Sequence, residues 1–194
     1  MQIPYSVDVR PDTGLHNARL GIWLFLASEV MLFAGLFSSY VLLRTGSAEW
    51  PRHVLAVAPA AANTVILIAS SMTMVMAWAS LTVRRWSRHR MYLSLTIVLG
   101  AVFLVVKGLE YREHVRAGEL PSHDTFFAIY YTLTGLHALH IAGGLAVMLY
   151  FLGPGSRLWA ASPEQFTNRI EATGLYWHFV DMIWILLFPL LYLI

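Results

Sequence analysis

Residues 171–194 read EATGLYWHFVDMIWILLFPLLYLI, and this stretch decides the fold. At about 1.5 Å rise per residue it is long enough to cross a bilayer as one helix. An aspartate near the centre of such a helix costs roughly 2.5 to 3.5 kcal/mol, so it should face protein and not lipid. Spacings of seven and three residues put Glu171, His178 and Asp181 on one face. We therefore expect a membrane helix with a polar, protein-facing stripe, on which Asp181 is the nearest partner of His178.

The composition of the whole chain agrees with a membrane protein. Hydrophobic residues make up 58% of the 194 residues and charged residues only 12%, which is too apolar for an ordinary soluble domain. The absence of cysteine excludes disulfides, thiolate metal sites and thiol nucleophiles. The arginines lie in short segments between apolar runs rather than on one face, so we expect no binding of nucleic acid.

Five apolar runs predict an all-α integral membrane protein with five transmembrane helices. They cover about 20–43, 54–83, 91–111, 126–152 and 172–194. The first run begins too deep in the chain for a cleaved signal peptide, and no small-residue cleavage site follows it. No connection is long enough to hold a soluble domain, so we expect one membrane domain over residues 1–194.

The distribution of arginine predicts the orientation of the bundle. On the side of the N-terminus lie Arg10, Arg19, Arg84, Arg85, Arg88, Arg90, Arg157 and Arg169. On the opposite side lie Arg44, Arg52, Arg112 and Arg116. Because cytoplasmic connections carry the excess of positive charge, we expect a cytoplasmic N-terminus and a periplasmic C-terminus.

Besides Asp181, two carboxylates lie inside predicted spans. Glu29 is about nine residues into the first span, near the bilayer midplane, where it either exchanges protons or forms a hydrogen bond to a neighbouring helix. Glu110 follows Lys107, the one lysine of the chain, by one helical turn. We expect Lys107 to extend its ammonium group to the interface, which leaves Glu110 as the more interesting residue of the two.

His137 and His140 lie one turn apart and deep in the fourth span. With Glu29, His178 and Asp181 they could bind iron, copper or zinc, which would make the chain an independent intramembrane metalloenzyme. Di-iron bundles use paired ExxH motifs, however, and this sequence has none. Interhelical hydrogen bonds are therefore the expected use of these groups, and we expect no metal site on the chain.

The order of these motifs resembles that of subunit III of the haem-copper oxidases, over roughly residues 15–194. The matching motifs are SEVMLF with Glu29, KGLEY with Glu110, TFF from Thr125, TGLHALH with His137 and His140, and EATGLYWHFVDMIW with Glu171, His178 and Asp181.

The resemblance implies a subunit without a catalytic centre or cofactor of its own, in a terminal oxidase of the bacterial inner membrane. Its partners would be the catalytic subunit I, subunit II and a small subunit IV, with haems and copper in those partners and phospholipid bound to the chain. It would keep proton uptake fast and protect the catalytic subunit from turnover inactivation, and Glu29 matches the family's carbodiimide-reactive acid.

One departure from the family is the number of helices. Many members have seven spans, whereas this chain resembles the short, five-helix bacterial form. The resemblance favours a cytochrome c oxidase. A quinol oxidase and an accessory protein of nitric oxide reductase are the alternatives, because the electron donor binds to other subunits.

Overall fold

The computed structural model describes residues 17–47, 50–51, 55–122 and 124–193. Its elements are α1 (Asn17–Gly46), α2 (Val57–Thr82), α3 (Trp86–Arg116), α4 (Thr125–Leu152), the short η1 (Pro154–Ser156) and α5 (Arg157–Ala161), α6 (Pro163–Phe188), and the π-helical turn η2 (Pro189–Leu193). Five helices are long and apolar enough to span a membrane. The predicted all-α architecture is confirmed.

The helices extend beyond the apolar runs of the sequence. Helix α3 begins at Trp86 and ends at Arg116, and α6 begins at Pro163, well before the last apolar run. Backbone hydrogen bonding continues through the polar interface, so the apolar run marks only the part of a helix that faces hydrocarbon. Pro163 suits the first position of α6, where a helix has no use for a backbone N–H.

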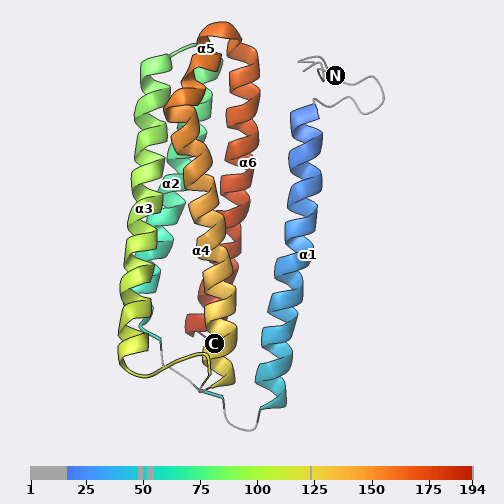
Figure 1. Cartoon of the computed structure of the whole chain (residues 1–194), viewed down its shortest axis with the longest axis vertical. Coiled ribbons are helices and arrows are strands. Elements are labelled where there is room, and N and C mark those ends of the chain that lie inside the picture. The colour runs from blue at the N-terminus through green and yellow to red at the C-terminus, as the bar shows by residue number, and fades with distance from the viewer. Residues whose placement is uncertain (1–16, 48–49, 52–54, 123, 194) are drawn as a thin grey trace.

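Helices α2, α3, α4 and α6 form a four-helix bundle, and α1 lies beside it (Figure 1). Around the bundle, α2 contacts α3, α3 contacts α4, and α6 contacts both α4 and α2, so α3 and α6 lie diagonally opposite. Helix α1 contacts α6 and α4. Its apolar stretch is only 11% buried, against 50% for α6, which makes α6 the central helix and α1 the outer one.

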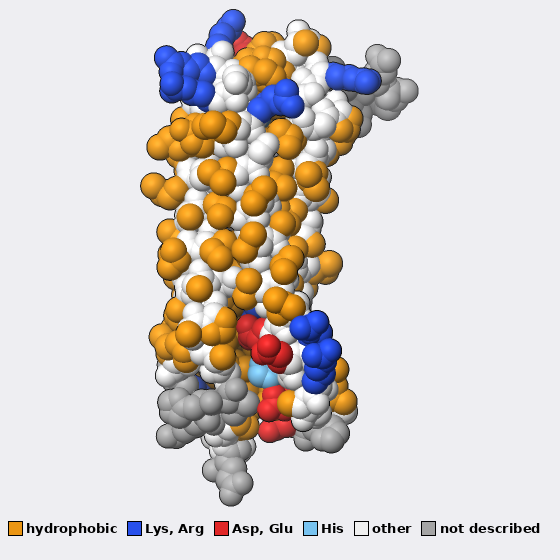
Figure 2. All heavy atoms as spheres, turned by 90° about the vertical axis from the view of Figure 1, so that its left-hand side faces the viewer, with side chains coloured by type: hydrophobic (Ala, Val, Ile, Leu, Met, Phe, Trp, Pro, Cys, Tyr) orange, Lys and Arg blue, Asp and Glu red, His pale blue; other side chains and the backbone are white. Residues whose placement is uncertain are grey.

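The surface is typical of a multi-pass membrane protein. Figure 2 shows hydrophobic side chains over the whole middle of the molecule and charged side chains at its two ends. Large apolar side chains of several helices are exposed, among them Met31, Leu42, Val65 and Leu139. Such a belt suits contact with lipid or with other apolar helices and not with water.

The bundle closes around Trp177 of α6, which is 1% exposed. A Cβ atom added at Gly100 of α3 would lie 2.8 Å from Trp177 Cη2, and one at Gly144 of α4 would lie 2.9 Å from Trp177 Cε3. The indole Nε1 donates a hydrogen bond to Ser70 Oγ of α2 at 3.1 Å. One side chain therefore contacts the other three helices of the bundle, and two glycines provide the space for it.

This packing predicts opposite effects of the same substitution at two adjacent glycines. Gly144→Ala places a methyl group against the buried Trp177 ring and should lower the free energy of unfolding by about 1–3 kcal/mol. Gly143→Ala meets only Tyr176 Oη at 3.8 Å and should be neutral or stabilising. Thermal unfolding in detergent measures both, and equal midpoints would contradict the role of Trp177.

Candidate functional site

Glu29 and His140 form a hydrogen-bonded pair where α1 meets α4. Glu29 Oε2 lies 2.9 Å from His140 Nε2, and both side chains are largely buried. His140 Nδ1 lies 2.8 Å from the carbonyl oxygen of Leu136. Because a carbonyl only accepts, Nδ1 carries a hydrogen, and the contact with Glu29 then needs one further proton. The pair can hold that proton either on the carboxylate or on the imidazole.

Aromatic rings and backbone groups enclose this pair. The ring of Phe33 meets that of His140 edge-on, with centroids 5.3 Å apart. Tyr176 of α6 donates its hydroxyl hydrogen to the carbonyl oxygen of His140 at 2.8 Å. The pair thus lies at a junction of α1, α4 and α6, within helices that are long and apolar enough to span a membrane.

Two further polar contacts attach α1 to the C-terminal part of the chain. Arg19 Nη2 forms an ion pair with Glu171 Oε1 of α6 at 2.5 Å. Tyr40 donates a hydrogen bond to the carbonyl oxygen of Leu190 in η2 at 2.9 Å. Together with Glu29, these residues attach α1 at three levels, about ten residues or 15 Å apart.

Lys107 is buried inside the bundle, so the prediction that it extends to the interface is wrong. Its side chain is 4% exposed. Its Nζ lies 3.1 Å from Glu110 Oε1 and donates to Tyr192 Oη at 2.5 Å. The face of Trp184 lies 5.0 Å from the ammonium. A carboxylate, a hydroxyl and an aromatic face therefore replace the water that an extended lysine would reach.

Glu110 is the centre of this cluster. Its Oε1 accepts hydrogen bonds from Tyr130 at 2.6 Å and from Tyr192 at 2.5 Å, in addition to the contact with Lys107. Its Oε2 is buried and has no hydrogen-bond partner among the residues that the structure describes. The cluster fastens η2 to α3 and α4 in the half of the bundle where α4 begins.

His137 and His140 have separate environments. The His137 ring lies between Phe103, edge-on at 5.7 Å, and Trp184, stacked at 5.3 Å, and is 1% exposed. Its two ring nitrogens have no partner within the described part of the chain. His137 therefore faces the bundle interior while His140 faces α1, and the two do not form one donor set. No group of three or more His, Asp or Glu placed to hold a metal ion occurs among the described residues.

The polar stripe of α6 contacts two different helices. His178 Nδ1 lies 2.5 Å from Ser71 Oγ of α2, and Asp181 also interacts with Ser71. The expectation that Asp181 is the partner of His178 is wrong, because the hydrogen-bond partner of His178 is the hydroxyl of Ser71 on the neighbouring helix. Glu171, on the same stripe, reaches Arg19 of α1 instead.

Sequence reasoning missed the hydroxyl groups that partner these residues. Ser71, Tyr130, Tyr176 and Tyr192 all lie in apolar runs and resemble ordinary membrane residues. The one available signal was Lys107, since a lysine at that depth needs acceptors from other helices if it stays buried.

The buried cluster predicts a non-additive response to mutation. Lys107→Met leaves the Glu110 carboxylate without its cation and should lower the free energy of unfolding by about 3–5 kcal/mol. Adding Glu110→Gln removes the unpaired charge and should restore much of that loss. Thermal unfolding of both variants in detergent tests this, and purely additive effects would show that the ion pair is not coupled.

Comparison with known proteins shows the family of the chain. The family model for cytochrome c oxidase subunit III matches residues 12–194. The chain is 30% identical to cytochrome bo(3) ubiquinol oxidase subunit 3 of Pseudomonas aeruginosa, over 99% of this chain and 91% of that protein. It is 32% identical to cytochrome c oxidase subunit 3 of Alkalihalophilus pseudofirmus (91% and 86%) and 34% identical to that of Synechocystis sp. (90% and 74%). The chain therefore belongs to the cytochrome c oxidase subunit III family and is a subunit III of a haem-copper oxidase.

Proposed function

We propose that this subunit supports assembly, proton uptake and turnover stability of the catalytic subunit, and that the Glu29–His140 pair is its proton-related site. The observation that carries the proposal is the contact of 2.9 Å between Glu29 Oε2 and His140 Nε2, inside the membrane-spanning stretches of α1 and α4. Burying a carboxylate inside a membrane costs free energy unless the group has a partner or a function. The partner of Glu29 is His140, which can itself ionise.

The other predicted site residues have supporting roles in this proposal. His137 and Glu110 belong to the buried core around Lys107, and His178 and Asp181 join α6 to α2. Glu171 holds the end of α1 through Arg19. The buried core around Lys107 and the contact of α6 with α2 set the position of α4 and α6, and hence of His140 opposite Glu29.

The proposed orientation places the N-terminus in the cytoplasm and the C-terminus in the periplasm. The α2–α3 turn and α5 lie at the same end of the molecule as the start of α1 (Figure 1). That end carries Arg19, Arg84, Arg85, Arg88, Arg90 and Arg157. This excess of arginine supports a cytoplasmic location for it.

We place the subunit, as one membrane domain, in the bacterial inner membrane, since the relatives named above are bacterial proteins. Its proposed partners are subunit I, subunit II and a small subunit IV, with the haems and copper in those partners, and membrane phospholipid. The apolar, little-buried surface of α1 offers an area for such contacts.

We propose cytochrome c oxidase as the enzyme, because the family model and most of the similar relatives carry that name. The ubiquinol oxidase relative of Pseudomonas aeruginosa supports a quinol oxidase as the alternative. Purification through a tag on this chain, with a visible spectrum, tests both. If haem co-purifies with the chain, the oxidation of either cytochrome c or quinol by the purified complex identifies the electron donor. A colourless chain that purifies alone would contradict membership of an oxidase complex.

The proton role of Glu29 is separable from its role in holding α1. Glu29→Gln keeps a hydrogen-bonding group opposite His140 but cannot ionise, so we expect normal assembly, slower proton uptake and a shorter turnover lifetime of the oxidase.

Arg19→Ala is the matched control, since it removes another contact of α1 without changing the pair. It should leave proton uptake unchanged. Proton uptake in reconstituted vesicles and loss of activity during turnover measure the difference. Proton uptake and turnover lifetime of Glu29→Gln equal to those of the wild type would contradict the proposed proton role of Glu29.

A further inference from the structure

The turn between α2 and α3 places an arginine in a backbone conformation that favours glycine. Arg84 has φ 54°, the one positive φ of a non-glycine residue among the described parts of the chain. Arg84 N donates to the carbonyl oxygen of Leu81 at 2.9 Å, and Arg85 N donates to that of Ser80 at 2.8 Å. This hydrogen-bond pattern ends many helices, usually with glycine at the left-handed position. A left-handed backbone conformation is energetically unfavourable for arginine. A function of the Arg84 side chain would compensate for this cost.

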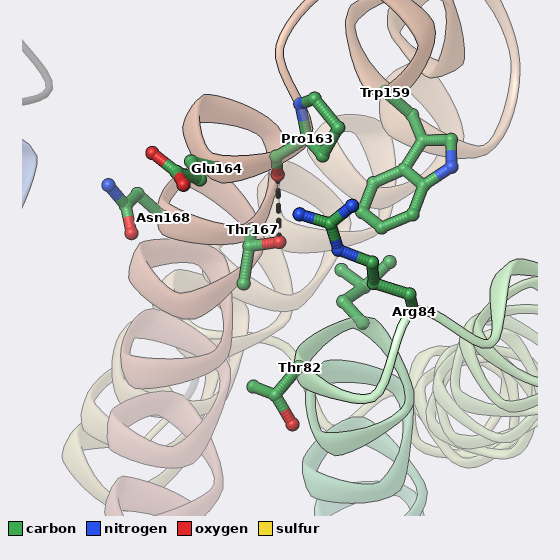
Figure 3. A pocket seen from close by; sticks show the side chains of 8 residues that line it. Thr82, Arg84, Trp159, Pro163, Glu164, Thr167 and Asn168 are labelled. Atoms are coloured by element: carbon green, nitrogen blue, oxygen red, sulfur yellow. Dashed lines mark hydrogen bonds between the residues drawn. The ribbon is translucent and has the colours of Figure 1, made fainter.

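The Arg84 side chain points into a pocket of about 270 Å³. The pocket lies between the end of α2, α5 and the first turns of α6, and its lining includes Arg84, Trp159, Pro163, Glu164 and Thr167. Figure 3 shows the guanidinium group beside Trp159 and next to the hydrogen bond from Thr167 Oγ1 to the Pro163 carbonyl oxygen.

The guanidinium group is available for a ligand. Within the described residues, no hydrogen bond or ion pair occupies its N–H donors. The carboxylate of Glu164, the one acidic group that lines the pocket, points away from it (Figure 3). Arg84 is exposed at this open pocket, and its planar fork of donors matches the oxygens of a phosphate group, which guanidinium binds through two parallel hydrogen bonds.

Building on the proposed phospholipid partner of the subunit, we propose that this pocket binds the phosphate group of a membrane phospholipid. Arg84 lies two residues beyond the membrane-spanning helix Val57–Thr82, which is the level of lipid headgroups. Val83, directly before it, is 63% exposed and continues the apolar surface along which an acyl chain can lie. Trp159 in the pocket wall is also typical of the interface. The headgroup of a phospholipid can occupy the polar pocket while its acyl chain covers the adjoining apolar surface.

The test uses the oxidase complex purified through a tag on this chain and stripped of lipid in mild detergent. Arg84→Gly removes the guanidinium and supplies the residue that the turn prefers, so it should fold normally and unfold, without lipid, at the same or a higher temperature. Arg88→Gln is the control, because Arg88 is an exposed arginine of α3 outside the pocket.

Phosphatidylglycerol is then titrated in mixed micelles, and its binding is read by native mass spectrometry and by the shift in melting temperature. We expect Arg84→Gly to bind it about tenfold or more weakly than wild type, the loss typical of a charge-assisted hydrogen bond, and Arg88→Gln to bind as wild type. Equal binding by Arg84→Gly and wild type would overturn the proposal.

Two probes separate the sources of the phosphate group. Diacylglycerol has the acyl chains without phosphate, and glycerol 3-phosphate has the phosphate without acyl chains. We expect neither to reproduce the effect of phosphatidylglycerol at matched concentration. Binding of diacylglycerol that depends on Arg84 would overturn the phosphate chemistry. Equal binding of glycerol 3-phosphate would overturn the lipid as the source and leave a site for small soluble anions.

Discussion

The position of Trp177 between Gly100 and Gly144 is the constraint on which the rest of the bundle depends. Its ring reaches from α6 across to the diagonally opposite α3, contacts α4, and fixes α2 through the hydrogen bond to Ser70. In lipid, apolar surface alone gives little preference for one helix arrangement over another, so close packing at small residues sets the geometry. Once α6 is fixed in this way, its polar stripe has defined neighbours.

Helix α1 follows a different principle, because it has little buried surface and relies on polar contacts. Arg19, Glu29 and Tyr40 each reach a partner on the bundle, and in the membrane interior such groups have few alternatives in lipid. The Glu29–His140 pair therefore has two roles in one contact. It positions the outer helix, and it is an ionisable group whose proton has two possible carriers.

Periodicity and composition predicted the five long helices and the deep positions of the polar residues, because both depend on local sequence. The partners of those residues were not predictable. Lys107 and Tyr192 are 85 residues apart, and only the closed bundle brings them together. His137 and His140 are one turn apart, yet three residues leave about 60° between them around the helix axis. That angle is enough to direct one ring into the core and the other toward α1.

The contact of Lys107 with Tyr192 also has a consequence for how the protein is made. When α3 enters the membrane during synthesis, Lys107 has Glu110 on its own helix, but Tyr130 follows later and Tyr192 much later. The Lys107–Glu110 ion pair therefore lacks part of its hydrogen bonding until η2 is inserted. The Tyr192 hydroxyl group of η2 then completes the cluster. Closure of this part of the bundle is then a late event in biogenesis, and a chain that lacks η2 leaves the Lys107–Glu110 pair without one of its hydroxyl partners inside the membrane.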